Sequence, residues 1–236
     1  MVSVPPRRLL VGVVLLLLLA AFLEGEAQAL EASGQTRQVQ RESPFLAGKR
    51  ILLDPGHGGD DPGAVQNGVK ESDLNWLIAK ELATFLEEAG AEVLFTRTEV
   101  GPFPTPRERV ELMESLDPDI IISIHCNAFP SPIWRGAQTF YNPEAKDPRS
   151  KELALYIQDA LRRLTPTTRH ANRGIDHYIL KAAQVPAATV ELGFLTNPED
   201  LALLKTETYR RRAAFAIFLG IAHFFAGSPV PPGEEG

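Results

Sequence analysis

Four residues have the side-chain types that a hydrolytic metal site would need. His57 follows the first predicted strand, Glu71 lies just before the first long helix, and His125 and Glu191 end two later strands. Two imidazoles and one carboxylate are the ligand set of a catalytic zinc ion, which keeps its fourth position for water. The ion lowers the pKa of that water toward ~7 and polarises a carbonyl oxygen. A second, unligated carboxylate is then needed to accept the proton of the water.

Each of these residues also has a simpler explanation. A lone histidine at a strand end is more often a hydrogen-bonded structural residue, and Glu71 alone would be a solvated carboxylate favoured by the helix dipole. Glu191 is harder to explain in this way, because an isolated charge at the end of a buried strand is costly unless it is paired. Spacing does not decide which glutamate is the ligand and which is the base.

The glycine-rich loop at residues 55–59 suggests a second interpretation, a phosphate-binding loop. It lacks the Gly-Lys-Ser/Thr ending of a P-loop, and its glycine spacing differs from the dinucleotide-binding fingerprint. We therefore favour a loop whose glycines let the backbone approach a substrate or a metal closely.

Alternating strands and helices must position these side chains. Short apolar runs predict strands, and apolar periodicity with capping residues predicts helices. We expect strands at 49–54, 91–96, 119–125, 136–141, 178–180 and 187–191. We expect helices at 72–89, with Ser72 as the cap, at 105–116, 150–164 and 209–225, and a short helix that begins at Asn197. This order predicts an α/β domain with a mainly parallel sheet. Sites in such sheets form where loops leave the carboxyl ends of the strands.

The first residues have the pattern of an export signal. Arg7 and Arg8 precede a 15-residue apolar run, Leu9 to Leu23, and Ala27-Gln28-Ala29 has the form of a cleavage site. We predict a signal peptide at 1–29 and an exported protein. An uncleaved membrane anchor is the alternative, although the run is shorter than the ~20 residues of a spanning helix.

Composition limits the remaining organisation and the partners. The 236 residues are 44% hydrophobic and 23% charged, which excludes collagen-like, wholly disordered and multi-span membrane proteins. A net charge of −6 offers no basic field for nucleic acid, and a single cysteine, Cys126, excludes an internal disulfide and multi-cysteine zinc modules. We expect a flexible tether at 30–47, one catalytic domain at 48–227 and a disordered tail at 228–236.

Four stretches, in this order, resemble the zinc-dependent N-acetylmuramoyl-L-alanine amidases of bacterial cell-wall turnover. They are Leu53-Asp-Pro-Gly-His-Gly-Gly59, Lys70-Glu-Ser-Asp-Leu-Asn75, Ser123-Ile-His-Cys-Asn-Ala128 and Val190-Glu-Leu-Gly-Phe-Leu-Thr-Asn197. The resemblance implies a single mixed, mostly parallel sheet flanked by helices on both faces. It also implies cleavage of the amide between muramic acid and the L-alanine of the stem peptide. By the same match His57, Glu71 and His125 hold one zinc ion per chain, and Glu191 is the catalytic base.

The stretches Phe129-Pro-Ser-Pro132 and Trp134-Arg-Gly-Ala-Gln-Thr-Phe-Tyr141 look like the spore-cortex branch of this family, the germination-specific amidases. Those enzymes strip peptides from muramic acid so that muramic δ-lactam can form. The alternatives are a vegetative amidase of division or turnover, a non-catalytic wall-binding regulator, and a zinc peptidase acting on the stem peptide. The absence of His-Glu-x-x-His spacing counts against the last.

Further residues are candidates for binding and support. Asn127 is a candidate to bind the substrate, with turn formation as the alternative, and Arg173 is a candidate to pair with a stem-peptide carboxylate, with a surface salt bridge as the alternative. Asp54 is a candidate to orient His57, and we expect Cys126 to be buried packing rather than a ligand. The expected partner is peptidoglycan, with no nucleic acid. An accessory exported protein is left open, and we expect a monomer.

Overall fold

The computed structural model describes residues 44–232. The expected signal peptide at 1–29, most of the expected tether and the last four residues of the expected tail lie outside the described residues. Within the described part, no helix combines the length and the apolar character needed to span a bilayer.

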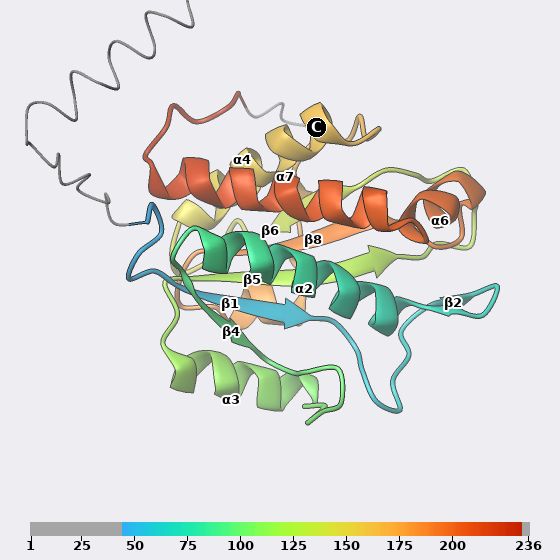
Figure 1. Cartoon of the computed structure of the whole chain (residues 1–236), viewed down its shortest axis with the longest axis horizontal. Helices are drawn as coiled ribbons and strands as arrows, with labels where there is room; N and C mark the ends of the chain where they lie inside the picture. Colours follow the sequence, from blue (N-terminus) through green and yellow to red (C-terminus); the bar gives the residue numbers. More distant parts are fainter. Residues whose placement is uncertain (1–43, 233–236) are drawn as a thin grey trace, which may run out of the picture. The chain divides into compact units, whose positions relative to one another are not determined.

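A six-stranded mixed sheet forms the centre of the fold (Figure 1). Its order is β4 (Glu92–Phe95), β1 (Arg50–Pro55), β5 (Ile120–Asn127), β8 (Ala187–Phe194), β6 (Gln138–Tyr141) and β7 (Asn172–Arg173). The first four strands run parallel, whereas β6 is antiparallel to β8 and parallel to β7. The expected mixed, mostly parallel sheet is therefore confirmed. A separate small hairpin, β2 (Val65–Gln66) and β3 (Val69–Lys70), follows the glycine-rich loop.

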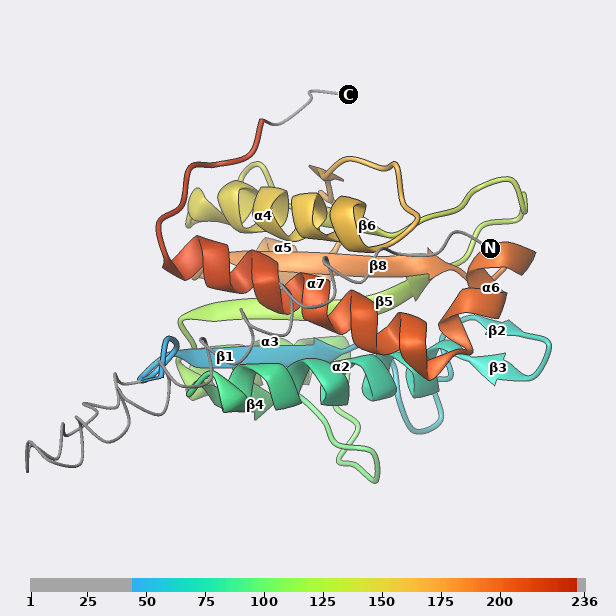
Figure 2. The ribbon, with the colours of Figure 1, turned by 45° about the horizontal axis from the view of Figure 1, so that its top comes forward.

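Helices cover both faces of the sheet. The helices α2 (Glu71–Glu88), α4 (Arg149–Leu164) and α7 (Glu207–Phe225) pack over one face, where they form the larger apolar core with the inward side chains of the strands (Figure 2). The helices α3 (Pro106–Leu116) and α5 (Tyr178–Ala182) lie over the other face and form a smaller apolar cluster with it. A short helix, α6 (Pro198–Leu204), follows β8. Because the second face is only partly covered, polar side chains can be exposed there.

Two helix starts confirm the capping residues expected from the sequence. The Thr105 side chain accepts a hydrogen bond from the backbone N–H of Glu108, whose side chain in turn accepts from the backbone of Thr105. The Asn197 side chain accepts from the backbone N–H groups of Glu199 and Asp200. These contacts satisfy amides that have no partner within the helix.

The structure corrects two predicted elements. Ser72 is not the cap of α2, because the helix already begins at Glu71 and the backbone N–H groups of Glu71 and Ser72 bond the carbonyls of Ala64 and Pro62. The loop thus supplies the partners that a cap would provide. Residues 178–180, expected as a strand, lie in α5, where Ile179 and Leu180 pack on the smaller core. A run this short does not distinguish a strand from a helix by its periodicity.

The folded domain begins earlier in the chain than the boundary expected between residues 47 and 48. Leu46, placed in the tether, is fully buried in the larger core, and its N–H bonds the carbonyl of Ala89. At the other end, the carbonyl of Ser228 accepts a hydrogen bond from the hydroxyl of Tyr156. The folded unit therefore includes residues on both sides of the expected limits of 48 and 227.

Candidate active site

The pairing of β5 with β8 gathers the first part of the site. In this parallel ladder His125 lies opposite Glu191, and Ser123 lies opposite Thr189. Residues paired across neighbouring strands point to the same face, so all four project from the face that α3 and α5 partly cover. The carboxyl ends of two central strands thus bring together two of the predicted residues that lie 66 positions apart.

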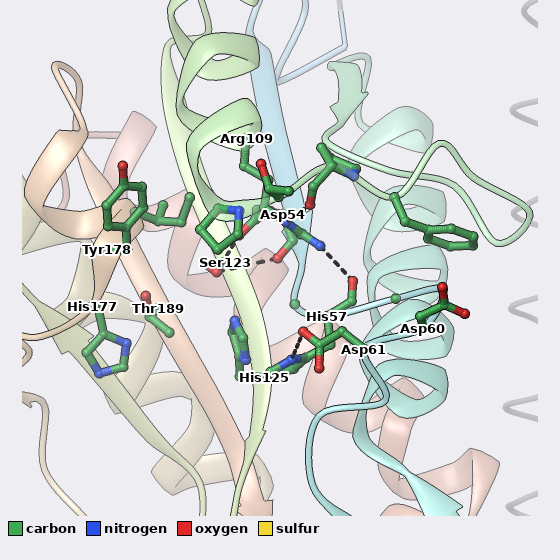
Figure 3. A pocket seen from close by; sticks show the side chains of 18 residues that line it. Asp54, His57, Asp60, Asp61, Arg109, Ser123, His125, His177, Tyr178 and Thr189 are labelled. Atoms are coloured by element: carbon green, nitrogen blue, oxygen red, sulfur yellow. Dashed lines mark hydrogen bonds and ion pairs between the residues drawn. The ribbon is translucent and has the colours of Figure 1, made fainter.

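A pocket of about 780 Å³ lies over this face. Figure 3 shows His57 and Asp61 on one side of it and His177 and Tyr178, from the region of α5, on the other, with His125 between them. The pocket gives a substrate access to the two histidines.

Glu71 joins the two histidines into one cluster. Its Oε1 atom lies 3.3 Å from His57 Nε2 and 2.9 Å from His125 Nδ1, and one ligand atom from each of the three residues lies within 4.8 Å of the others. A tetrahedral ion with ligand bonds of about 2.0–2.2 Å separates its ligand atoms by roughly 3.3–3.6 Å. The three ligand atoms are therefore close enough together for one metal ion to bind all of them after small adjustments.

The Glu71 carboxylate is buried and fixed by further donors. The backbone N–H of Ala64 donates to Oε2 at 3.0 Å, while the Asn75 side chain and the backbone N–H of Cys126 each donate to Oε1 at 3.3 Å. Burial alone would raise the pKa of Glu71, but the bonds with His125 and His57 outweigh it and hold the pKa well below its usual value. The carboxylate is consequently ionised and held in one orientation.

Asp61 fixes the orientation of His57. Its Oδ2 atom lies 2.8 Å from His57 Nδ1, which leaves Nε2 directed at Glu71. A carboxylate behind a histidine is the usual way of fixing the tautomer of a metal ligand. Asp61 is not among the residues expected from the sequence, although its position four residues after His57, close to the glycine-rich loop, was an available signal.

The two imidazoles lie in an environment that favours positive charge. The hydrogen bond with Glu71 raises the pKa of His57 to about 9 against the opposing effect of burial, and Asp61 adds to the rise. Burial would lower the pKa of His125, but Glu71 and Glu191 outweigh it and raise the pKa. Surplus carboxylate charge around two imidazoles suits a bound cation, which competes with protons for the same nitrogen atoms.

Glu191 lies beside this cluster, opposite His125 in the β5–β8 ladder. Its Oε2 atom is buried and has no hydrogen-bond partner among the described residues. Burial raises the pKa of Glu191 to about 7; the charge of His125 opposes this rise and the charge of Glu71 adds to it. Neither Glu191 nor Glu71 is among the residues that line the pocket. A carboxylate with a raised pKa beside three candidate ligand side chains has the proton affinity that a general base needs.

The prediction that Asp54 orients His57 is wrong. The Asp54 carboxylate instead accepts hydrogen bonds from Arg109 Nη1 at 2.7 Å, Thr96 Oγ1 at 2.6 Å and Ser123 Oγ at 2.7 Å. Burial would raise the pKa of Asp54, but these partners lower it. A buried carboxylate needs a cation and donors close by, and Asp54 finds them in Arg109 and two hydroxyl groups.

The remaining candidates occupy different places. Asn127 is half-buried at the end of β5, where its carbonyl accepts from the N–H of Leu195, and Arg173 is exposed on β7. Neither residue belongs to the set that lines the pocket. Cys126 is buried in the larger core on the opposite side of the sheet from His125, as expected, and burial raises its pKa well above the usual value.

Comparisons with known proteins identify the family of this chain. The N-acetylmuramoyl-L-alanine amidase family matches residues 51–223. The germination-specific N-acetylmuramoyl-L-alanine amidase of Bacillus subtilis (strain 168) is 40% identical over 201 residues, covering 79% of this chain and 84% of that protein.

Solved structures give the same result. The CwlD amidase from Clostridioides difficile, solved in complex with the GerS lipoprotein, superposes with a TM-score of 0.72 at 33% identity, covering 76% of this chain and all of that chain. The N-acetylmuramoyl-L-alanine amidase from Clostridium difficile 630 has a TM-score of 0.72 at 29% identity, covering 78% of this chain. The protein therefore belongs to the N-acetylmuramoyl-L-alanine amidase family, the enzymes that act on cell-wall peptidoglycan.

Proposed function

We propose that this protein is a zinc-dependent amidase that hydrolyses the bond between N-acetylmuramic acid and the L-alanine of the peptidoglycan stem peptide. The observation that carries the proposal is the cluster of His57, Glu71 and His125, whose ligand atoms lie within 4.8 Å of one another. Beside it lies Glu191, whose buried Oε2 atom has no hydrogen-bond partner in the described part of the chain. Family membership supplies the substrate class.

His57, Glu71 and His125 are the residues that would hold the zinc ion. When bound, the ion supplies Lewis-acid chemistry: it makes water more acidic and polarises the carbonyl oxygen of the scissile amide. Asp61 keeps the His57 ring turned toward Glu71, and the donors around Glu71 keep its carboxylate in place. These contacts limit the reorganisation needed when the ion binds.

Glu191 moves the proton in the proposed reaction. The oxygen of a water molecule attacks the carbonyl carbon, and Glu191 accepts the proton that this water loses. The bond between carbon and nitrogen then breaks, and Glu191 delivers the proton to the leaving amine of L-alanine. The pairing of Glu191 with His125 across β8 and β5 supports this role, because it places the base next to a ligand on a rigid sheet.

We also propose that the substrate is spore cortex and that the enzyme acts after export. The germination-specific relative from Bacillus subtilis supports this assignment, as does the resemblance of residues 129–141 to that branch. The Clostridioides difficile relative was solved with a lipoprotein, which supports an accessory exported partner for this chain as well. A general vegetative amidase is the second candidate.

The test of the chemistry separates binding from catalysis. Purified wild type should release intact stem peptides beginning with L-alanine from peptidoglycan, as identified by mass spectrometry of the fragments. Glu191→Ala should keep bound zinc and lose this release, whereas His57→Ala should lose both. Glu87→Ala and His223→Ala change the same residue types at exposed positions and should retain both.

Each alternative predicts a different result. Full release by Glu191→Ala or His57→Ala would contradict the assigned roles, and cleavage within the stem would show a peptidase. A wild type that binds peptidoglycan without releasing peptides would show a regulator. For the cortex assignment, a deletion strain should sporulate normally and lack muramic δ-lactam; a growth or division defect with normal cortex would favour the vegetative role.

A further inference from the structure

Two buried arginines surround the loop that carries His57. Arg97, just after β4, is 3% exposed, and Arg109, in α3, is 7% exposed. Neither side chain touches the three proposed zinc ligands through a ligand atom; both bind backbone carbonyl groups of the loop instead.

The two guanidinium groups donate to three consecutive carbonyls. Arg109 donates from Nη1 to the carbonyl of Pro55 at 2.8 Å and from Nη2 to the carbonyl of His57 at 2.6 Å. Arg97 donates from Nε to the same Pro55 carbonyl at 2.8 Å and from Nη2 to the carbonyl of Gly56 at 3.1 Å. The backbone on both sides of the His57 α-carbon is thus fixed by charged donors, which form stronger hydrogen bonds than neutral ones.

Arg97 also connects this loop to the segment that carries Glu71. Its Nη2 atom donates to the carbonyl of Ser72 at 2.8 Å, one residue after Glu71. The N–H of Gly56 in turn bonds the carbonyl of Ile124 at 2.9 Å, one residue before His125. The backbone segments of all three proposed ligands therefore meet at the carbonyls and amides around Gly56.

The backbone of His57 requires such restraint. Its φ of 61° lies in the left-handed region, which is unfavourable for a non-glycine residue and persists only when the surroundings impose it. The two following residues, Gly58 and Gly59, also have positive φ and add no stiffness of their own. The arginines bond the carbonyls of Gly56 and His57, on both sides of this left-handed residue, and so restrain its backbone.

Both arginines carry charge in this buried position. Arg109 is paired with the Asp54 carboxylate at 2.7 Å. Burial, with the nearby charge of Arg109, lowers the pKa of Arg97 to about 10, so Arg97 is still protonated at neutral pH. The planar fork of a guanidinium reaches several carbonyls at once, which a lysine ammonium on a flexible stem does not reproduce.

We propose that Arg97 and Arg109 are positioning residues of the amidase, which hold the carbonyls of residues 55–57 so that the His57 imidazole is preorganised for the metal. This inference rests on the proposed function, because it assumes that His57 is a zinc ligand. The arginines act on the reaction only through the loop.

The test uses Arg97→Lys and Arg109→Lys in the full chain. Zinc affinity is measured by competition with a chromophoric chelator, and loop order by hydrogen exchange of the metal-free protein. We expect zinc affinity to fall by about 10- to 100-fold, the usual effect of losing a group that orients a ligand. The amides of Gly56 and Gly58, which bond the carbonyls of Ile124 and Asp61, should exchange faster than in wild type. At saturating zinc, kcat should recover while KM stays near the wild-type value.

Two controls separate positioning from general destabilisation. Arg211→Lys makes the same change at an exposed arginine paired with Glu81 on the opposite side of the sheet, and Leu161→Ala weakens the larger core. Both should keep zinc affinity and the exchange rates of the loop. If Arg109→Lys does not fold, Arg97→Met replaces it: within residues 44–232 no carboxylate forms an ion pair with Arg97, so this change leaves none of them unpaired.

The outcomes distinguish this inference from the proposed function. If wild type binds zinc and the arginine variants match it in affinity and loop exchange, the positioning role is overturned and the metal site stands. If wild type binds no zinc, the proposed function fails, and the exchange of the metal-free variants still decides whether the arginines order the loop.

Discussion

Gly56 lies directly against the imidazole of His125. A Cβ atom at position 56 would overlap the ring, with Nδ1 of His125 only 2.5 Å away. The close approach of the backbone, rather than an unusual φ, is what requires glycine here, and it lets the loop after β1 reach the end of β5. The same Gly56 bonds the carbonyl of Ile124, so strand pairing continues up to the ligand residue.

Gly56→Ala should therefore displace His125 and impair the metal site. Overpacking of this kind typically costs about 1–3 kcal/mol of stability. We expect a loss of zinc affinity of at least about tenfold, since a ligand ring must move. Gly220→Ala is the control: its Cβ would meet Ile157 between α7 and α4, so it should lower the melting temperature and keep zinc affinity. Wild-type zinc affinity in Gly56→Ala would contradict the role of this contact.

Removal of the metal should lower stability as well as activity. A ligand that binds only the folded state stabilises it by about 2.7 kcal/mol at a concentration 100 times its Kd. Zinc added to chelator-treated protein should therefore raise the melting temperature, and the rise should be absent in Glu71→Gln. The measurement is thermal unfolding by circular dichroism across a zinc titration. An equal rise in Glu71→Gln would show that zinc binds elsewhere.

The Asp54–Arg109 pair predicts a pH-dependent stability difference. Asp54→Asn leaves a buried guanidinium without its carboxylate, and breaking such a pair typically costs about 3–5 kcal/mol. Because the folded-state pKa of Asp54 is lowered, its ionisation stabilises the fold fully above the ordinary pKa of 3.8, and this stabilisation is lost as pH falls through the folded-state value.

This pH dependence is measured by denaturant unfolding of wild type and Asp54→Asn between about pH 7 and about pH 2.5. The difference between wild type and Asp54→Asn should be constant near neutral pH and shrink only below about pH 4. Asp117→Asn, at an exposed position, should follow wild type throughout. A difference that grows on acidification would have the wrong sign and refute the assignment.

Leu46 predicts where the folded domain begins. Leu46→Ala removes a fully buried side chain and should cost roughly 2–5 kcal/mol of unfolding free energy. The neighbouring Phe45, 58% exposed, is the matched control, and Phe45→Ala should change stability by less than about 0.5 kcal/mol. If Leu46→Ala and Phe45→Ala have equal free energies of unfolding in urea, Leu46 does not belong to the folded domain.

The sequence alone predicted the elements whose signals are local. Capping residues marked the starts of α3 and α6, and short apolar runs marked β1, β5 and β8, because these patterns depend on neighbours within a few positions. Prediction failed where contacts outside the local pattern decide the structure. The carbonyls of Ala64 and Pro62 bond the first backbone N–H groups of α2, so Ser72 is not needed as a cap. Residues 178–180, expected as a strand, form part of a helix that lies over the sheet.

In the candidate site, too, some features could be predicted from the sequence and others could not. The types and order of His57, Glu71, His125 and Glu191 could be read from the sequence together with the family resemblance, since they lie in motifs at the ends of predicted elements. Only the tertiary structure decided their supports. In the folded protein His57 bonds Asp61, Asp54 pairs with Arg109, and Arg97 bonds the backbone of the loop. These partners depend on the tertiary structure, because a buried charge pairs with whichever group the strand order and register bring near it.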